Sequence, residues 1–79
     1  MKAKVHVELK ESVLDPQGQA IVLAAATSGI CNLVSARVSK VFDLDLGNVD
    51  SNEAKIKAEE LSKRLLANDV IERYFIEIV

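Results

Sequence analysis

The first ten residues alternate strictly between apolar and polar side chains. One side carries Ala3, Val5, Val7 and Leu9, and the other carries Lys4, His6, Glu8 and Lys10. A period of two with β-branched residues predicts a strand from Met1 to Lys10 with one buried face. Such a strand belongs in a sheet that other elements cover on one side.

A helix is predicted next, from about Pro16 to Ser28. Asp15 can cap the free amides of its first turn, and Pro16 suits the first helical position because its φ is already set. Gly29 can end the helix because glycine adopts positive φ without strain. The centre of this helix, Ala20 to Ala26, has no polar residue on any face. Two explanations stay open: these alanines are tolerated in solvent, or another chain covers the helix.

The remaining segments predict two strands, a helix and a final strand. The strands are Asn32–Lys40 and Val41–Leu46, joined as a hairpin or as one long bent strand. Asp50 and Glu53 form a capping box for a helix over Asp50–Asn68, and Val70–Val79 alternates as the last strand. The predicted fold is α+β and ferredoxin-like, βαββαβ, an antiparallel sheet with two helices on one face, in a single domain over residues 1–79.

Size and charge exclude several classes of function. A chain of 79 residues has room for one small core, so a partner is expected. The net charge of −2 gives no basic footprint for nucleic acid, and Phe75 is the one aromatic residue that the open sheet face would offer for base stacking. The Ala20–Ala26 run is too short to span a membrane. A lone cysteine, Cys31, fits a reducing compartment and indicates a cytoplasmic protein.

No set of residues predicts catalysis. His6 and Cys31 are the candidates to start a nucleophile–base pair, but His6 lies mid-strand and Cys31 follows the first helix. We interpret His6 as a solvated or interface side chain and Cys31 as a small, partly buried one. The three glycines are scattered, so no phosphate loop is present, and no spacing suits zinc or calcium. We therefore expect this chain to hold no catalytic residue, cofactor or metal.

The segment Leu9–Gly18 is unusual for a plain connection between a strand and a helix. Its polar and turn-forming residues surround Val13 and Leu14. It is interpreted either as a capped helix start whose two apolar side chains fold back onto the core, or as a docking loop.

Three segments carry a resemblance to a known family. LKESVLDPQG, Leu9 to Gly18, resembles the segment after the first strand in the PurS family, the small subunit of phosphoribosylformylglycinamidine synthase. Leu65 to Asn68 with the following Val70, Ile71, Glu72 and Tyr74 resembles that family's LLANxVIExY. Val34, Arg37, Val38 and Lys40 resemble its VxxVRxGK, although Ser39 stands where the family has Gly.

The resemblance implies a role in a purine-biosynthesis complex. The family's complex uses ATP, magnesium and glutamine to convert formylglycinamide ribonucleotide into formylglycinamidine ribonucleotide. A glutaminase subunit releases ammonia, and a large synthetase subunit uses it. The small subunit forms dimers, binds both larger subunits, assists ammonia transfer and carries no catalytic residue. This chain is expected to do the same, as a homodimer or higher oligomer.

Two segments, Lys10–Gly18 and Asn68–Tyr74, are expected to face partner subunits. The candidate contact residues are Lys10, Glu11, Ser12, Asp15, Gln17, Gly18, Arg37, Asn68, Arg73 and Tyr74. An alternative remains: a ferredoxin-like regulatory domain that binds an amino acid at a dimer interface, with Asp15 to Gly18 forming the site.

Overall fold

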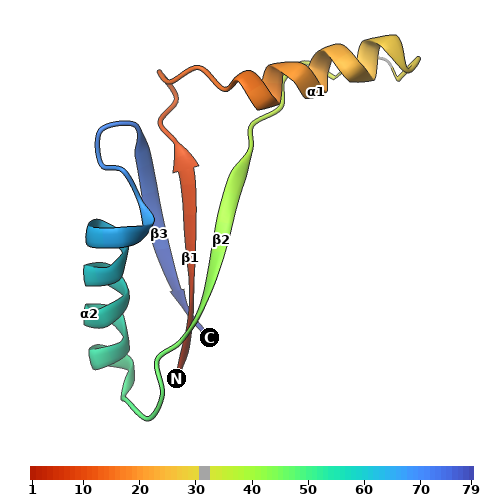
Figure 1. The fold of residues 1–79 in the computed structure, drawn as a ribbon. Coiled ribbons are helices and arrows are strands. Elements are labelled where there is room, and N and C mark those ends of the chain that lie inside the picture. Colours follow the sequence, from red (N-terminus) through yellow and green to blue (C-terminus); the bar gives the residue numbers. More distant parts are fainter. Residues whose placement is uncertain (31–32) are drawn as a thin grey trace.

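The computed structural model describes residues 1–30 and 33–79. Over this part of the chain the elements are β1 (Lys2–Leu9), α1 (Pro16–Thr27), β2 (Ser39–Asp45), α2 (Ser51–Leu61), the π-helical turn η1 (Ser62–Leu66) and β3 (Glu72–Ile78). The strands form an antiparallel sheet in the order β2-β1-β3, with β1 in the centre (Figure 1). The α+β, ferredoxin-like class predicted from the sequence is confirmed.

The core lies between β1 and α2. The predicted alternation of β1 holds: Ala3, Val5 and Val7 are buried and form one cluster with Ala58 on α2. Ala54, on the same helix, is also buried. Small residues on α2 let the helix approach the sheet closely. Half-buried apolar side chains from β2 and β3 complete the core.

The position of α1 corrects the prediction that both helices cover one face of the sheet. Figure 1 shows α2 against the sheet and α1 projecting beyond its end. The Cα radius of gyration is 16.1 Å, against about 12 Å for a compact domain of this length. The molecule measures 49 × 24 × 14 Å along its principal axes. We call residues 16–30 and 33–36, which comprise α1 and the described part of the chain that runs back beside it, the arm.

The predicted pair of strands is also corrected. The expected boundary near Lys40 falls inside β2, so this region is not a hairpin. It is not one long bent strand either, because β2 begins at Ser39 and residues 33–38 are not part of a strand. Residues 33–38 run back beside α1 and lead directly into β2, without pairing in the described sheet (Figure 1). Asn32, where the first of these strands was predicted to begin, lies outside the described residues. A strand pattern yields a strand only where a neighbouring strand is available to pair with it.

The helix boundaries follow the capping residues found in the sequence. The Asp15 carboxylate accepts the Gly18 amide at 2.8 Å, and the Asp50 carboxylate accepts the Glu53 amide at 2.8 Å. Gly29 has a φ of 80°, as expected for the residue that ends α1. The second predicted helix is confirmed, but its last turn is π-helical, with the Ala67 amide donating to the Ser62 carbonyl at 3.0 Å.

Candidate subunit interface

The two segments expected to face partners meet at one end of the sheet. The Lys10 amide donates to the Ile71 carbonyl at 2.9 Å, and Lys10 Nζ donates to the Asp69 carbonyl at 2.7 Å. Within the turn, the Asn68 carboxamide oxygen accepts the Val70 amide at 3.1 Å. Lys10 therefore joins the start of the loop to the 68–71 turn. We call these two segments, residues 10–14 and 68–71, the sheet tip.

Arg73 and Tyr74 extend from the tip to opposite faces of β3. Arg73 Nε donates to Glu8 Oε1 at 2.6 Å on the open face of the sheet. The Tyr74 hydroxyl donates to Glu59 Oε1 at 3.2 Å on the face covered by α2. Burial raises the pKa of the Tyr74 hydroxyl, and the hydrogen bond to Glu59 raises the pKa further. Successive strand residues point to opposite faces, so the two residues cannot serve one flat contact surface.

Asp15 joins the base of the arm to the start of β2. Its side chain is buried, and its second oxygen accepts the Val38 amide at 2.7 Å. The hydrogen bond from Val38 lowers the pKa of the Asp15 carboxyl below its ordinary 3.8, and the hydrogen bond from Gly18 lowers it further. Both oxygens therefore bind backbone amides of this chain.

Gly18 and Arg37 also have roles inside the chain. A Cβ atom at Gly18 would lie 2.0 Å from the Ala36 carbonyl oxygen, so α1 approaches the returning chain as closely as a glycine allows. The two terminal nitrogens of Arg37 donate to the Val13 carbonyl at 2.9 Å and to the Lys10 carbonyl at 3.0 Å. Much of the unusual 9–18 sequence is thus explained by how it fixes the arm.

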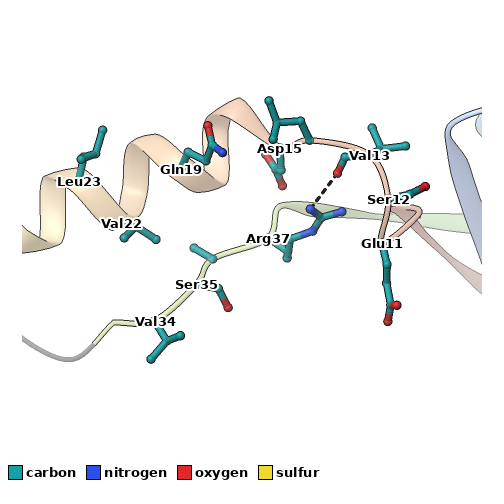
Figure 2. A pocket seen from close by; sticks show the side chains of 12 residues that line it. Glu11, Ser12, Val13, Asp15, Gln19, Val22, Leu23, Val34, Ser35 and Arg37 are labelled. Carbon is teal, nitrogen blue, oxygen red and sulfur yellow. Dashed lines mark hydrogen bonds between the residues drawn. The ribbon is translucent and has the colours of Figure 1, made fainter.

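A cavity of about 560 Å³ opens between α1, the 11–15 loop and the returning chain. Figure 2 shows Arg37 reaching across it to the Val13 carbonyl, while Val22 and Leu23 line it from α1. Leu14 and Leu23 are about two-thirds exposed, and Val34 is 91% exposed. The prediction that Val13 and Leu14 fold back onto the core therefore fails for Leu14.

The remaining candidates lie on the surface. Glu11, Ser12, Gln17 and Asn68 are exposed. Three of the ten candidates, Asp15, Gly18 and Arg37, shape the loop, and Lys10 joins it to the turn. Sequence reasoning missed Val38 and Asp69, whose backbone groups bind Asp15 and Lys10, because a backbone partner leaves no mark in the residue types.

The open face of the sheet holds the one histidine. His6 stacks on Phe75 with ring centroids 4.4 Å apart, and its Nε2 lies 3.4 Å from Glu77 Oε1.

Cys31 lies outside the described residues. Among residues 1–30 and 33–79, no group of three or more His, Cys, Asp and Glu is placed to hold a metal ion. No helix in the same part of the chain is long and apolar enough to cross a membrane.

Comparison with known proteins gives matches over nearly the whole chain. The family model "PurS: Phosphoribosylformylglycinamidine (FGAM) synthase" matches residues 2–79. The subunit PurS of phosphoribosylformylglycinamidine synthase from Archaeoglobus fulgidus is 38% identical over 76 residues, which cover 96% of this chain and 95% of that protein.

Solved structures give the same match. The crystal structure of Methanocaldococcus jannaschii PurS, described as one of the subunits of formylglycinamide ribonucleotide amidotransferase in the purine biosynthetic pathway, has a TM-score of 0.87 at 36% identity, covering 96% of this chain and 92% of that one. A chain in the structure of PurLQS from Thermotoga maritima has a TM-score of 0.88 and covers 99% and 95% of the two chains; at 22% identity it shows the shared fold.

Proposed function

Because this chain belongs to the PurS family, whose members are subunits of the phosphoribosylformylglycinamidine synthase complex of purine biosynthesis, we propose that it is a non-catalytic subunit. In this role it holds the glutaminase and synthetase subunits together. The observation that carries the proposal is the extent of the match. The family model spans residues 2–79, and the relative from Archaeoglobus fulgidus is covered over 95% of its own length. The chain therefore matches subunits of this kind over nearly all of the residues given. In this proposal ATP, magnesium and the reacting groups belong to the larger chains.

In the proposed complex, the glutaminase subunit releases ammonia. The synthetase subunit uses ATP to react this ammonia with the amide of formylglycinamide ribonucleotide. Ammonia that escaped into water at neutral pH would be protonated and would lose its nucleophilic lone pair. Two active sites that share ammonia therefore gain from being held in a fixed arrangement. We propose that this chain supplies that arrangement in the cytoplasm.

The sheet tip is the proposed contact with the larger subunits. It brings together parts of two of the three family motifs at one end of the sheet, and its backbone is fixed by Lys10 and Arg37. Glu11, Ser12 and Asn68 are exposed on it. A rigid loop loses little conformational entropy on binding, which favours tight association.

Self-association is proposed through the arm. Leu23 and Val34 are exposed on it, and a helix of 12 residues is marginal in water without packing. Of the two explanations open for this apolar helix, cover by another chain is the one that these exposed side chains support.

The test is a co-purification of the chain with the glutaminase and synthetase subunits. Reversing two charges near the tip, Lys10→Glu with Arg73→Glu, should weaken assembly. The melting temperature of the isolated chain should fall little, because each residue makes a solvent-exposed contact worth about 0–1 kcal/mol.

A matched control changes the same charges on α2 and the turn that follows it. Lys57→Glu with Arg64→Glu breaks two exposed ion pairs, to Glu53 and Glu60, away from the tip. This variant should assemble like the wild type. Normal assembly of the tip variant would refute the contact, and a wild-type chain that failed to bind either subunit would refute the function. The alternative amino-acid site gains no support, because both Asp15 oxygens already bind backbone amides.

A further inference from the structure

The outer edge of β3 presents a row of backbone groups that have no partner in the described part of the chain. β3 pairs with β1 on one side and forms an outer edge of the sheet on the other (Figure 1). We propose that an extended segment of one of the larger subunits adds to this edge as a further strand. This inference deepens the proposed function and rests on it, because it names a surface that a larger subunit pairs with.

The hydrogen bonds at the two ends of β3 show which of its backbone groups are free. The Lys10 amide donates to the Ile71 carbonyl at 2.9 Å. The Val79 amide donates to the Lys2 carbonyl, also at 2.9 Å. Odd-numbered residues of β3 therefore bond to β1, because bonded pairs alternate along an antiparallel ladder. The residues whose amides and carbonyls point to the outer edge are the even-numbered Tyr74, Ile76 and Ile78.

This edge lacks the features that keep exposed strands from pairing. Such edges are commonly short, bulged or interrupted by proline, or they carry lysine. β3 is seven residues long, pairs with β1 without a bulge, and contains no Pro, Gly or Lys. Its charged residues on the open face, Arg73 and Glu77, contact Glu8 and His6 on β1. These charges are thus used inside the sheet, and the edge stays open to strand addition.

A groove of about 690 Å³ runs along the same edge. Phe75 lines it from the open face of the sheet, and Lys55 and Glu59 line it from α2. The groove therefore reaches both faces of β3. An added strand also has side chains on both faces, since successive residues point in opposite directions, so the groove fits an extended segment.

The apolar part of the lining sets the side chains that the segment needs. On the face toward α2, Ile76 and Ile78 are half-buried beside the groove and favour aliphatic neighbours. On the open face, Phe75 stacks one side of its ring on His6 and is still 54% exposed. Its other side is available to an apolar or aromatic side chain of the partner.

The charges of the lining add one polar requirement. Glu59 accepts the Tyr74 hydroxyl at 3.2 Å and lies 3.6 Å from Lys63 Nζ. Lys55 is exposed and makes no ion pair within residues 1–30 and 33–79. The unmatched charge of the groove is positive, so the added segment carries a carboxylate that meets Lys55.

The position of the edge also favours a larger subunit over a second copy of this chain. Residues 68–71 of the sheet tip lead directly into β3, so a subunit bound to the tip lies beside the start of the edge. Pairing of β3 with β3 of a second copy would instead bring a second unmatched Lys55 into the groove, where the two like charges repel.

Amide exchange tests the pairing directly. The complex with the larger subunits is exchanged in D₂O and dissociated by acid quench, and the remaining amide protons of this chain are read by NMR. Amides of the even-numbered residues 74, 76 and 78 should exchange on the order of 10-fold or more slowly in the complex than in the chain alone, because a hydrogen bond must open first. Amides of residues 73, 75 and 77 bond to β1 in both states and serve as the internal reference.

Two charge reversals on α2 test the groove. Lys55→Glu places a negative charge in it, whereas Lys57→Glu changes an exposed lysine that pairs with Glu53 and does not line it. Affinity for the larger subunits should fall about 10-fold in Lys55→Glu, because the partner's carboxylate is then repelled, and should be unchanged in Lys57→Glu. Both variants should melt close to the wild type, because exposed charges contribute little to stability.

Three results would overturn the strand addition. These are unchanged exchange at the even-numbered residues in a complex that forms, protection of the same amides that rises with the concentration of the chain alone, and equal weakening by Lys55→Glu and Lys57→Glu. The second result would assign the edge to a second copy. Each of the three leaves the proposed function standing, whereas a wild-type chain that binds neither larger subunit would refute the function and this contact together.

Discussion

Replacing Gly18 by alanine tests how tightly the arm is fixed to the returning chain. A Cβ at this position would lie 2.0 Å from the Ala36 carbonyl oxygen, and ordinary contact begins at 3.4 Å. The arm would have to shift by more than 1 Å or strain its backbone. Overpacking against a backbone atom lowers the free energy of unfolding by about 3 kcal/mol, the upper end of the usual range. The better helix propensity of alanine raises it by about 1 kcal/mol.

The expected net loss is therefore about 2 kcal/mol, which lowers the melting temperature of a chain this size by roughly 8–16 °C. The assay is thermal unfolding at fixed protein concentration, because self-association makes the midpoint depend on concentration. Ala20→Gly, at an exposed site two residues along α1, is the control and should lose about 1 kcal/mol through propensity alone. If propensity dominated, Gly18→Ala would raise the midpoint, and that result would refute the close contact.

Three further predictions concern buried and half-buried groups. The pKa of Asp15 is lowered in the folded chain, so its contribution to the free energy of unfolding is complete above the pKa of the unfolded chain. This contribution is lost as the pH falls through the pKa of the folded chain. Urea unfolding over an acid pH series should show the loss in the wild type and not in Asp15→Asn. Val5→Ala, at a fully buried site, should lower the free energy of unfolding by about 2 kcal/mol, seen as a lower urea midpoint with an unchanged slope. Tyr74 is the only tyrosine, so tyrosinate absorbance reports it alone; the titration should lie above 10.0 and move down in Glu59→Gln, and an unchanged midpoint in that variant would contradict the contact.

The candidate site could be predicted in part. The two motifs that form the tip were found from their residue types, and the structure brings them together through Lys10. Their proposed role toward larger subunits stays a prediction, as does the single domain over residues 1–79. The helix cap made by Asp15 was predicted and is confirmed. The second contact of Asp15, to Val38, and the contacts of Arg37 were missed because their partners are backbone atoms more than twenty residues away.

The sequence by itself determined the local elements. Alternation set the buried face of β1, Asp15 and Asp50 set the starts of both helices, and Gly29 ended the first one. These features depend on residues within a turn or a strand of one another, so neighbouring side chains are enough to specify them.

Only the tertiary structure decided where α1 lies and whether residues 33–38 form a strand. Asp15 binding Val38, and Gly18 lying against Ala36, direct the arm away from the sheet. A segment with a strand pattern becomes a strand when an edge is present to pair with it, and the described chain gives residues 33–38 no such edge within one copy. Alternation of apolar and polar residues predicts a strand and shows which of its faces is covered, as in β1. It does not show which strand the segment pairs with, so it could not decide the structure of the Val34–Val38 segment.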